Sequence, residues 1–401
     1  MISPRLGLLN NIPFVIPFED RVKIFRMFVE NDRRRNGIDD LRRISLDREI
    51  RRHHVFEDGF ASLYGLGSEL KRKIAITFVD EFGLQEAGID GGGVFKEFLT
   101  SLGHEAFDTN YGLFLATPDQ MLYPNSSRYA TEPDQLAYYE FLGLIIGKAL
   151  YEGVLLDVAF ADFFLKRCLG RVNYLDDLPS LDPELYNGLI QVKNFQGDVE
   201  DLCLDFTLTR DELGQSETVE LIPGGTHIPV TNTNRIRYVY LVADYRLNVQ
   251  IAKQSKAFHR GLSTIIDIKW LRMFNQQELQ VLLGGAYVPI DLEDLRLHTV
   301  YAGYTDKDRV VQDFWRALCS FNNEERMKFV KFVTSCSRPP LLGFKELTPQ
   351  FCIRRGEADD NRLPTSSTCV NLLKLPPFSS YSILRQKLVY AITAEAGFDL
   401  S

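Results

Sequence analysis

The sequence lacks the features that mark metal-binding, membrane-spanning and nucleic-acid-binding proteins. Its six cysteines form no CxxC pair and no cluster with histidine at zinc-ligand spacing, so we expect no structural metal. Its apolar stretches are interrupted by charges before they reach the roughly twenty residues of a membrane span. The formal net charge of -8 argues against a general nucleic-acid or membrane-surface role.

A secretory leader is also missing from the start of the sequence, which looks like the edge of a longer protein. Scattered cysteines in a large chain then indicate reduced thiols. We therefore expect the protein in the cytoplasm, the nucleus or both.

Two glycine patterns point to packing and not to ligand binding. Residues 88–98 match neither GxxxxGKS/T nor GxGxxG, so we interpret them as a tight turn that enters a helix. Gly143 and Gly147 have GxxxG spacing, and we expect them to let two helices of a globular protein approach closely.

The order of predicted elements indicates two lobes. The chain has 401 residues, enough for two or three domains. Gly284 and Gly285 precede Pro289, which predicts a flexible hinge and a smaller lobe of about 110 residues after it. Apolar periodicity predicts helices near residues 18–34, 182–195, 310–321, 324–334 and 381–396, and strands near residues 74–79, 351–354 and 370–375.

Cys369 lies in an unusual setting within the smaller lobe. Four hydroxyl side chains, at residues 365–368, precede it, and Pro364 and Pro376 bracket the run. A single cysteine is commonly a small core residue. Hydroxyl-rich loops are poor core segments, however, and a loop that enters a strand suits a reactive thiol. From these residues alone both interpretations stay open.

The predicted helix at residues 182–195 also has two interpretations. Its apolar residues share one side, which is typical of a core-facing helix and of a helix that offers a groove to a partner. Periodicity does not separate the two. The residues concerned are Leu185, Leu189, Val192 and Phe195.

Four segments, in this order, resemble the HECT-type ubiquitin ligases. The chain end at residues 397–401 is also similar to the end of that family's domain, and the resemblance runs from about residue 18 to residue 401. Residues 241–248 and 339–347 are most similar to the proteasome-associated subgroup. The four segments are residues 88–98, 141–151, 332–340 and 363–371.

The resemblance implies an α+β, bilobal fold. A large, mainly helical N-lobe would occupy residues 1–284 and contain a small conjugating-enzyme-binding subdomain at about residues 170–232. A hinge at residues 285–288, including the end of the Gly284-Gly285 pair, would join it to a small α/β C-lobe at residues 289–401 that bears the cysteine.

The resemblance also implies an activity. Cys369 would accept ubiquitin from a conjugating enzyme as a thioester and transfer it to a lysine of a substrate or of ubiquitin, without a cofactor. The implied partners are ubiquitin, a conjugating enzyme, protein substrates and the proteasome. The residues that would grip the conjugating enzyme are Leu185, Leu189, Val192, Phe195 and Tyr238.

Further roles follow for residues close to the thiol and at the chain end. Thr368 and Asn371 are candidates for holding the thioester carbonyl and its oxyanion. The resemblance implies that Phe398 docks the C-terminal tail, and Asp399 would then orient the attacking lysine. Many members have histidine two residues before the cysteine and phenylalanine after it, where this chain has Ser367 and Val370, so a base at position 367 is not available.

Two other functions compete with this interpretation. A cysteine protease would pair Cys369 with His298 or His259, which requires a histidine within hydrogen-bond reach of the thiol. A non-catalytic adaptor would bind conjugating enzymes without using Cys369 at all.

Overall fold

The structure is a computed structural model that describes residues 9, 11–38, 45–80, 82–85, 93–212, 215–286 and 288–393. The chain folds into two compact units. The first unit holds Phe107–Gly147 and Ala159–Leu279, together with Met1–Pro13. The second holds Phe14–Ala106, Lys148–Val158 and Gln280–Ser401, and so takes segments from both predicted lobes. The lobe boundaries themselves stay a prediction.

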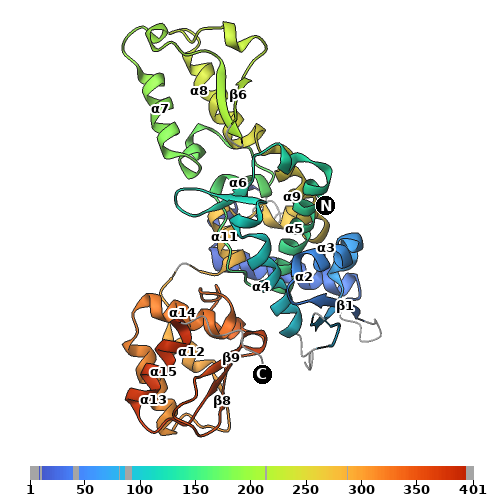
Figure 1. Cartoon of the computed structure of the whole chain (residues 1–401), viewed down its shortest axis with the longest axis vertical. Helices are drawn as coiled ribbons and strands as arrows, with labels where there is room; N and C mark the ends of the chain where they lie inside the picture. The colour runs from blue at the N-terminus through green and yellow to red at the C-terminus, as the bar shows by residue number, and fades with distance from the viewer. Residues whose placement is uncertain are drawn as a thin grey trace. The chain divides into compact units, whose positions relative to one another are not determined.

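The first unit is mainly helical, with two short antiparallel hairpins (Figure 1). Two of its helices, α5 and α6, contribute many fully buried side chains. The hairpins are β3 with β4 and β5 with β6. In chain order the unit contains β3 (Phe114–Ala116), β4 (Leu122–Pro124), α5 (Pro133–Glu152, which runs on into the second unit), α6 (Asp162–Cys168), α7 (Pro183–Asn194), β5 (Thr207–Glu212), β6 (Gln215–Glu220), α8 (Arg235–Asp244), α9 (Ala252–Ile265) and α10 (Ile268–Leu271).

Helices α5 and α9 cross at glycines. A Cβ atom added at Gly143 would lie 2.0 Å from the carbonyl oxygen of Phe258, and one added at Gly261 would lie 1.9 Å from that of Glu140. No side chain fits at either position, so the two backbones touch directly. The expectation that Gly143 permits close helix packing is confirmed.

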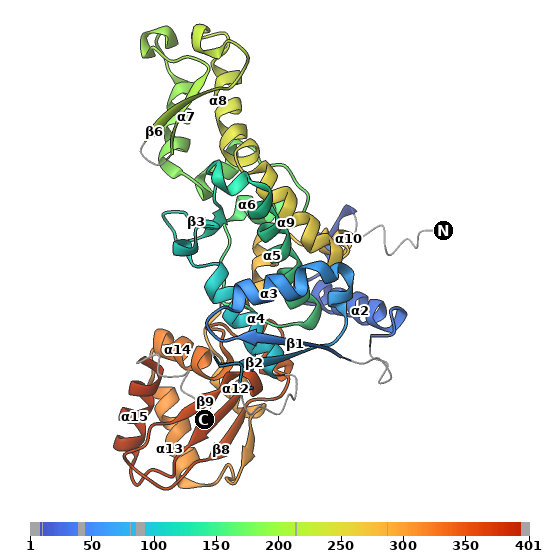
Figure 2. The ribbon, with the colours of Figure 1, turned by 45° about the vertical axis from the view of Figure 1, so that its right-hand side comes forward.

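Helices α7 and α8 lie side by side over a common core (Figures 1 and 2). Asp182 caps the start of α7 by accepting from the backbone N–H of Leu185 at 2.9 Å, and Pro183 follows at the first turn. At the other end of α7, Arg235 of α8 donates to the carbonyl of Phe195 at 2.7 Å. Both ends of the predicted partner helix are therefore held in place.

The second unit begins with elements that precede the main part of the first unit, Phe107–Gly147, in sequence. The strand predicted at residues 74–79 is present and pairs in parallel with the strand before it. The elements are α2 (Phe18–Arg35), β1 (Leu46–Arg51), α3 (Val55–Leu63), β2 (Ile74–Val79) and α4 (Gly93–Ala106). Helix α4 carries Lys96 and Glu97, whose charges act on Cys369.

The C-terminal part of the second unit is a four-stranded sheet with helices packed around it (Figure 2). The strand order is β7-β8-β10-β9, in which only β9 is antiparallel to its neighbour. Helix α14 starts with a capping box in which Asn322 and Glu325 satisfy each other's backbone N–H groups. The elements are α11 (Gln276–Gly284, which begins in the first unit), α12 (Leu292–Leu297), β7 (Val300–Ala302), α13 (Arg309–Ser320), α14 (Asn323–Thr334), β8 (Cys352–Arg355), β9 (Thr365–Ser367), β10 (Leu372–Leu375) and α15 (Tyr381–Thr393).

Within the described ranges, none of the helices combines the length and the apolar character needed to cross a bilayer.

The glycine crossing of α5 and α9 gives a stability prediction. Gly143→Ala forces a methyl group into the backbone of α9, and we expect the free energy of unfolding to fall by about 1–3 kcal/mol. Gly188→Ala in α7 is the matched control, because a Cβ there meets nothing within 4 Å. Alanine should leave stability unchanged or raise it by about 0.5–1 kcal/mol at that helical position. Urea denaturation of both variants checks this, and equal stabilities would contradict the close crossing.

Candidate active site

Cys369 sits in the middle of the short connection between β9 and β10. Residues Thr368–Val370 form one turn of 3-10 helix, and the strands on either side pair Ser367 with Leu372. The cysteine is partly buried. The sequence predicted a loop that enters a strand at Val370, whereas β10 begins at Leu372 because the intervening residues turn back on themselves. The thiol is thus presented on a tight turn supported by two strands.

Asn371 closes this turn. Its backbone is left-handed, with φ 50° and ψ 46°, a conformation that asparagine tolerates better than most residues. Only 1% of the residue is exposed. Its side-chain amide donates to the carbonyl of Pro349 at 2.6 Å, and its own carbonyl accepts from the N–H of Cys352 at 2.9 Å. Asn371 therefore ties the turn to the segment that leads into β8.

Helix α4 approaches the same turn with a lysine. The ammonium group of Lys96 donates to the Asn371 side-chain oxygen at 2.7 Å and to the Thr368 carbonyl at 3.2 Å. One turn along α4, the Thr100 hydroxyl lies 3.4 Å from that of Ser335. The backbone on the N-terminal side of Cys369 and the side chain that closes the turn are thus held by one cation.

Opposing charges act on the Cys369 thiol. Burial raises its pKa above the ordinary cysteine value, the carboxylate of Glu97 raises it further, and the nearby Lys96 ammonium lowers it. Glu97 is itself ion-paired with Arg52. Burial lowers the pKa of Lys96 to about 8, so this lysine is mainly protonated at neutral pH. The two charged residues of α4 thus act on the thiol in opposite directions, and the net effect of its surroundings is a raised pKa.

The other cysteines differ from Cys369 in exposure and setting. Cys168 and Cys336 are buried, and burial raises the pKa of both thiols, that of Cys336 to about 11. Cys203 and Cys319 are exposed, and Cys352 is partly buried in β8. The site around Cys369 combines partial exposure with a cation that contacts the turn. Across the described ranges, no group of three or more His, Cys, Asp or Glu side chains is arranged to hold a metal ion.

The two histidines proposed for a protease have other partners. His298 Nδ1 lies 2.9 Å from the carbonyl of Asp294 and 3.0 Å from its carboxylate. His259 Nδ1 lies 3.0 Å from the carbonyl of Cys168. Each of the two rings thus has a contact of its own at Nδ1.

The predicted partner groove is divided between core and surface. Leu189 and Tyr238 belong to the core under α7 and α8, with 3% and 8% of each residue exposed. The Tyr238 ring packs edge-on against Phe206 at 5.7 Å. The other three residues, Leu185, Val192 and Phe195, are partly buried and border that core. Leu189 and Tyr238 therefore offer little surface to a partner.

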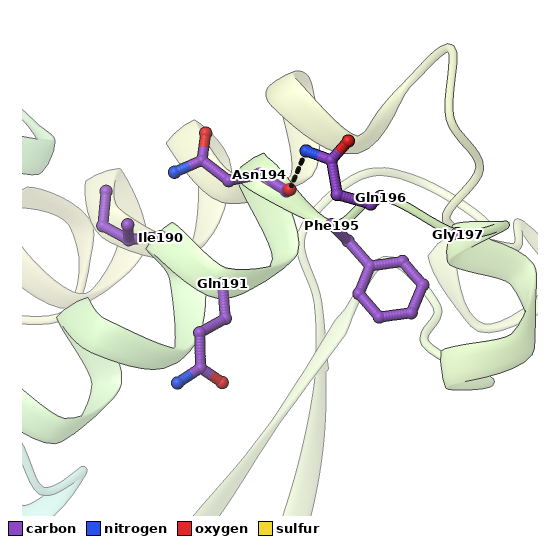
Figure 3. Close-up of a pocket in the computed structure, with 6 residues that line it drawn as sticks. All are labelled: Ile190, Gln191, Asn194, Phe195, Gln196 and Gly197. Carbon is purple, nitrogen blue, oxygen red and sulfur yellow. Dashed lines mark hydrogen bonds between the residues drawn. The ribbon is translucent and has the colours of Figure 1, made fainter.

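A pocket lies beside the C-terminal end of α7. Phe195 is one of the residues that line it, and Figure 3 shows its ring extending from the end of the helix. A Cβ atom at Gly197 would lie 2.8 Å from that ring, so glycine leaves the room that the ring occupies. Gln196 donates to the Asn194 carbonyl at 3.1 Å and stabilises the bend after the helix. The residues that line the pocket are Ile190, Gln191, Asn194, Phe195, Gln196 and Gly197.

The remaining predicted residues lie at the hinge and the chain end. Gly285 has a left-handed φ of 84°, which favours glycine, and its neighbour Gly284 ends α11. The hinge motion stays a prediction. Phe398 and Asp399 lie outside the described residues.

Sequence reasoning missed Lys96 and Glu97. Both lie in residues 88–98, where the glycines suggested a turn and the adjacent charges suggested nothing. A lysine and a glutamate at the start of a helix carry no signal of their own, because solvated charges there are common. The signal that existed was their place within a motif shared with the resembled family.

Comparisons with known proteins give the same family as the sequence motifs at residues 88–98, 141–151, 332–340 and 363–371. A family model described as HECT-domain (ubiquitin-transferase) matches residues 100–401. A probable E3 ubiquitin protein ligase of Schizosaccharomyces pombe is 50% identical over 99% of this chain and 39% of its own length. The E3 ubiquitin-protein ligase UPL6 of Arabidopsis thaliana is 48% identical over 98% of this chain and 39% of its own length. HUL5 of Saccharomyces cerevisiae, also an E3 ubiquitin-protein ligase, is 45% identical over 99% of this chain and 45% of its own length. The chain thus spans less than half the length of these relatives.

The closure of the turn by Asn371 can be tested with two substitutions. Asn371→Gly keeps the left-handed backbone accessible and removes the amide, so we expect a loss of about 1–3 kcal/mol from the unpaired Pro349 carbonyl. Asn371→Ala should cost about 1 kcal/mol more, because its Cβ disfavours that backbone. Urea denaturation measures both. Alanine matching glycine, or matching the unmodified protein, would contradict the closure of the turn by this residue.

Proposed function

Because the chain belongs to the HECT-domain ubiquitin-transferase family, we propose that it is the catalytic region of a ubiquitin ligase that carries ubiquitin on Cys369. The observation that supports this proposal best is the setting of the thiol. It is a partly buried cysteine on a tight turn, held by Asn371 and by the Lys96 ammonium. A nucleophile on a rigid support suits acyl transfer between two large proteins.

The first step is attack by the Cys369 thiolate on the thioester that links ubiquitin's C-terminal glycine to the conjugating enzyme. One thioester replaces another, so alignment matters more than driving force. The raised pKa of Cys369 leaves less thiolate at neutral pH than a free cysteine has. Thr368 lies next to the thiol and is the candidate for holding the carbonyl oxygen.

Asn371 was also expected to hold the oxyanion, and that role stays a proposal. Its side-chain amide already donates to the Pro349 carbonyl, and its side-chain oxygen accepts from Lys96. These bonds support the turn. In the proposed mechanism, Asn371 therefore acts first by orienting Cys369.

The second step is attack by a lysine amine on the Cys369 thioester. This amine must lose a proton, since an ordinary lysine has a pKa near 10.4. A carboxylate next to the thioester would orient the ammonium group and accept the proton. We propose Asp399 for this role, with Phe398 docking the tail that carries it.

The conjugating enzyme would bind at α7. Leu185, Val192 and Phe195 offer apolar surface, and the pocket beside Phe195 could receive an apolar side chain of the partner. Leu189 and Tyr238 would support this surface from the core. Protein substrates and the proteasome complete the proposed partners, and the hinge at Gly284 and Gly285 would let the thiol serve both steps.

The proposed thioester gives a direct prediction. We expect a ubiquitin adduct when the protein is mixed with ubiquitin, activating enzyme, conjugating enzyme and ATP and run on a non-reducing gel. Cys369→Ala should abolish the adduct, and Cys369→Ser should give an oxygen ester that survives thiol reductants. Cys352→Ala is the control, because this nearby thiol lies in β8 outside the turn. An adduct that persists in Cys369→Ala would contradict the proposal.

The proposed groove gives a binding prediction. Phe195→Ala should raise the concentration of ubiquitin-loaded conjugating enzyme needed for half-maximal thioester formation by about tenfold, which corresponds to about 1.4 kcal/mol. The maximal rate should change little, because the ring is not expected to touch the reacting atoms. Tyr129→Ala, at an exposed aromatic residue of the same unit, should leave both quantities unchanged. Equal effects of the two substitutions in single-turnover assays would argue against the groove.

A further inference from the structure

Lys96 contacts the catalytic turn from a distant part of the sequence. It lies 272 residues before Thr368 and 275 residues before Asn371. Both contacts place its ammonium group against carbonyl-type oxygens that flank Cys369. The two steps of the proposed reaction give this lysine no task, although burying a lysine is costly unless its charge is used or satisfied.

The geometry assigns Lys96 the role of a positioning residue for Cys369. Two bonds, at 2.7 Å and 3.2 Å, join one ammonium group to the side chain that closes the turn and to the backbone carbonyl just before the cysteine. Loss of the ammonium would free both oxygens and the turn between them. The same cation lies close enough to favour the negative thiolate over the neutral thiol. This inference rests on the proposed role of Cys369.

The charged groups around Lys96 define its electrostatic effect. Glu97, on the same helix, opposes it by disfavouring the thiolate, and Arg52 is paired with Glu97. Cys336 also faces Lys96, and Asp157 and Arg338 act on Cys336. Of these groups, Lys96 is the cation that both contacts the turn and lowers the pKa of Cys369.

Lys96 transfers no proton in the proposed first step. The Cys369 S–H bond loses its proton to water or buffer, and the thiolate forms a bond to the glycine carbonyl carbon. The bond from that carbon to the conjugating enzyme's sulfur then breaks, and that sulfur leaves as a thiolate. Lys96 holds the turn before the attack, while the thiol ionises, and takes no part in these bond changes.

The pKa of Lys96 sets the pH range of this effect. With a pKa of about 8, the ammonium is present at neutral pH and is lost as the pH rises through that value. The support for the thiolate therefore weakens above pH 8, where ordinary thiols ionise. An arginine at position 96 would keep its charge over the whole range.

The experiment measures the reactivity of Cys369 directly. The complete chain is treated with iodoacetamide between pH 6 and pH 9.5, and peptide-resolved mass spectrometry follows alkylation at Cys369. The exposed Cys319 in the same sample is the internal standard. Lys96→Met removes the charge, Lys96→Arg keeps it, and Lys73→Met removes a charge from an exposed lysine elsewhere. Thioester formation is measured in parallel.

We expect Lys96→Met to slow alkylation of Cys369 at pH 7 by roughly three- to tenfold, which corresponds to half to one pKa unit. The midpoint of its pH profile should move upward. Lys96→Arg should restore the alkylation rate at pH 7. Above pH 8 the rate in this variant should increase more steeply with pH than the rate in the unmodified protein. The rates of thioester formation should rank the variants in the same order. Lys73→Met should not alter alkylation of Cys369, and alkylation of Cys319 should be the same in every variant.

Superimposed profiles for Lys96→Met and Lys73→Met would overturn the inference, as would faster thioester formation in Lys96→Met. If Lys96→Met does not fold, the comparison of Lys96→Arg with the unmodified protein above pH 8 decides, and identical profiles there reject the inference. Failure of the proposed function is a separate outcome, in which the unmodified protein forms no thioester on Cys369.

Discussion

Asn371 holds the turn that carries Cys369, and the arrangement of the site depends on this one residue. Its left-handed backbone reverses the chain within four residues, and its buried amide joins the turn to Pro349 and to Lys96. A flexible loop would lose entropy each time the thiol met a partner. Here the turn loses its conformational entropy when the protein folds, so the thiol is already oriented before a partner binds. The same bonds explain why asparagine suits this position.

The two units divide the work of the proposed ligase. The first unit presents α7 with its pocket, held at both ends by the Asp182 cap and by Arg235. The second unit holds the thiol and the two charged residues of α4. In the proposed function, binding of the conjugating enzyme and chemistry on the acyl group are therefore assigned to different units.

Much of this organisation could be predicted from the sequence, because it rests on local signals. The family resemblance, drawn from four motifs, is confirmed by the family model over residues 100–401 and by relatives that are 45–50% identical. An α+β fold that is mainly helical, with small sheets, is confirmed. Strand β2, helix α14 and the packing role of Gly143 were predicted correctly, since periodicity, capping residues and glycine spacing encode them.

Properties that depend on contacts distant in sequence could not be predicted. The start of β10 was placed too early, because nothing local shows that Asn371 turns left-handed to meet Pro349 and Lys96. Leu189 and Tyr238 were assigned to a partner surface, whereas the structure buries them, since a helical stripe looks the same in both cases. Lys96 was missed because its partners are more than 270 residues away.

The measurement that tests the central claim most directly identifies the acylated residue itself. Ubiquitin-loaded protein is quenched in acid, digested without reductant and analysed by mass spectrometry for the residue that bears ubiquitin's C-terminal glycine. The account predicts the remnant on Cys369. A remnant on Cys203, Cys319 or Cys352 in place of Cys369 would contradict it.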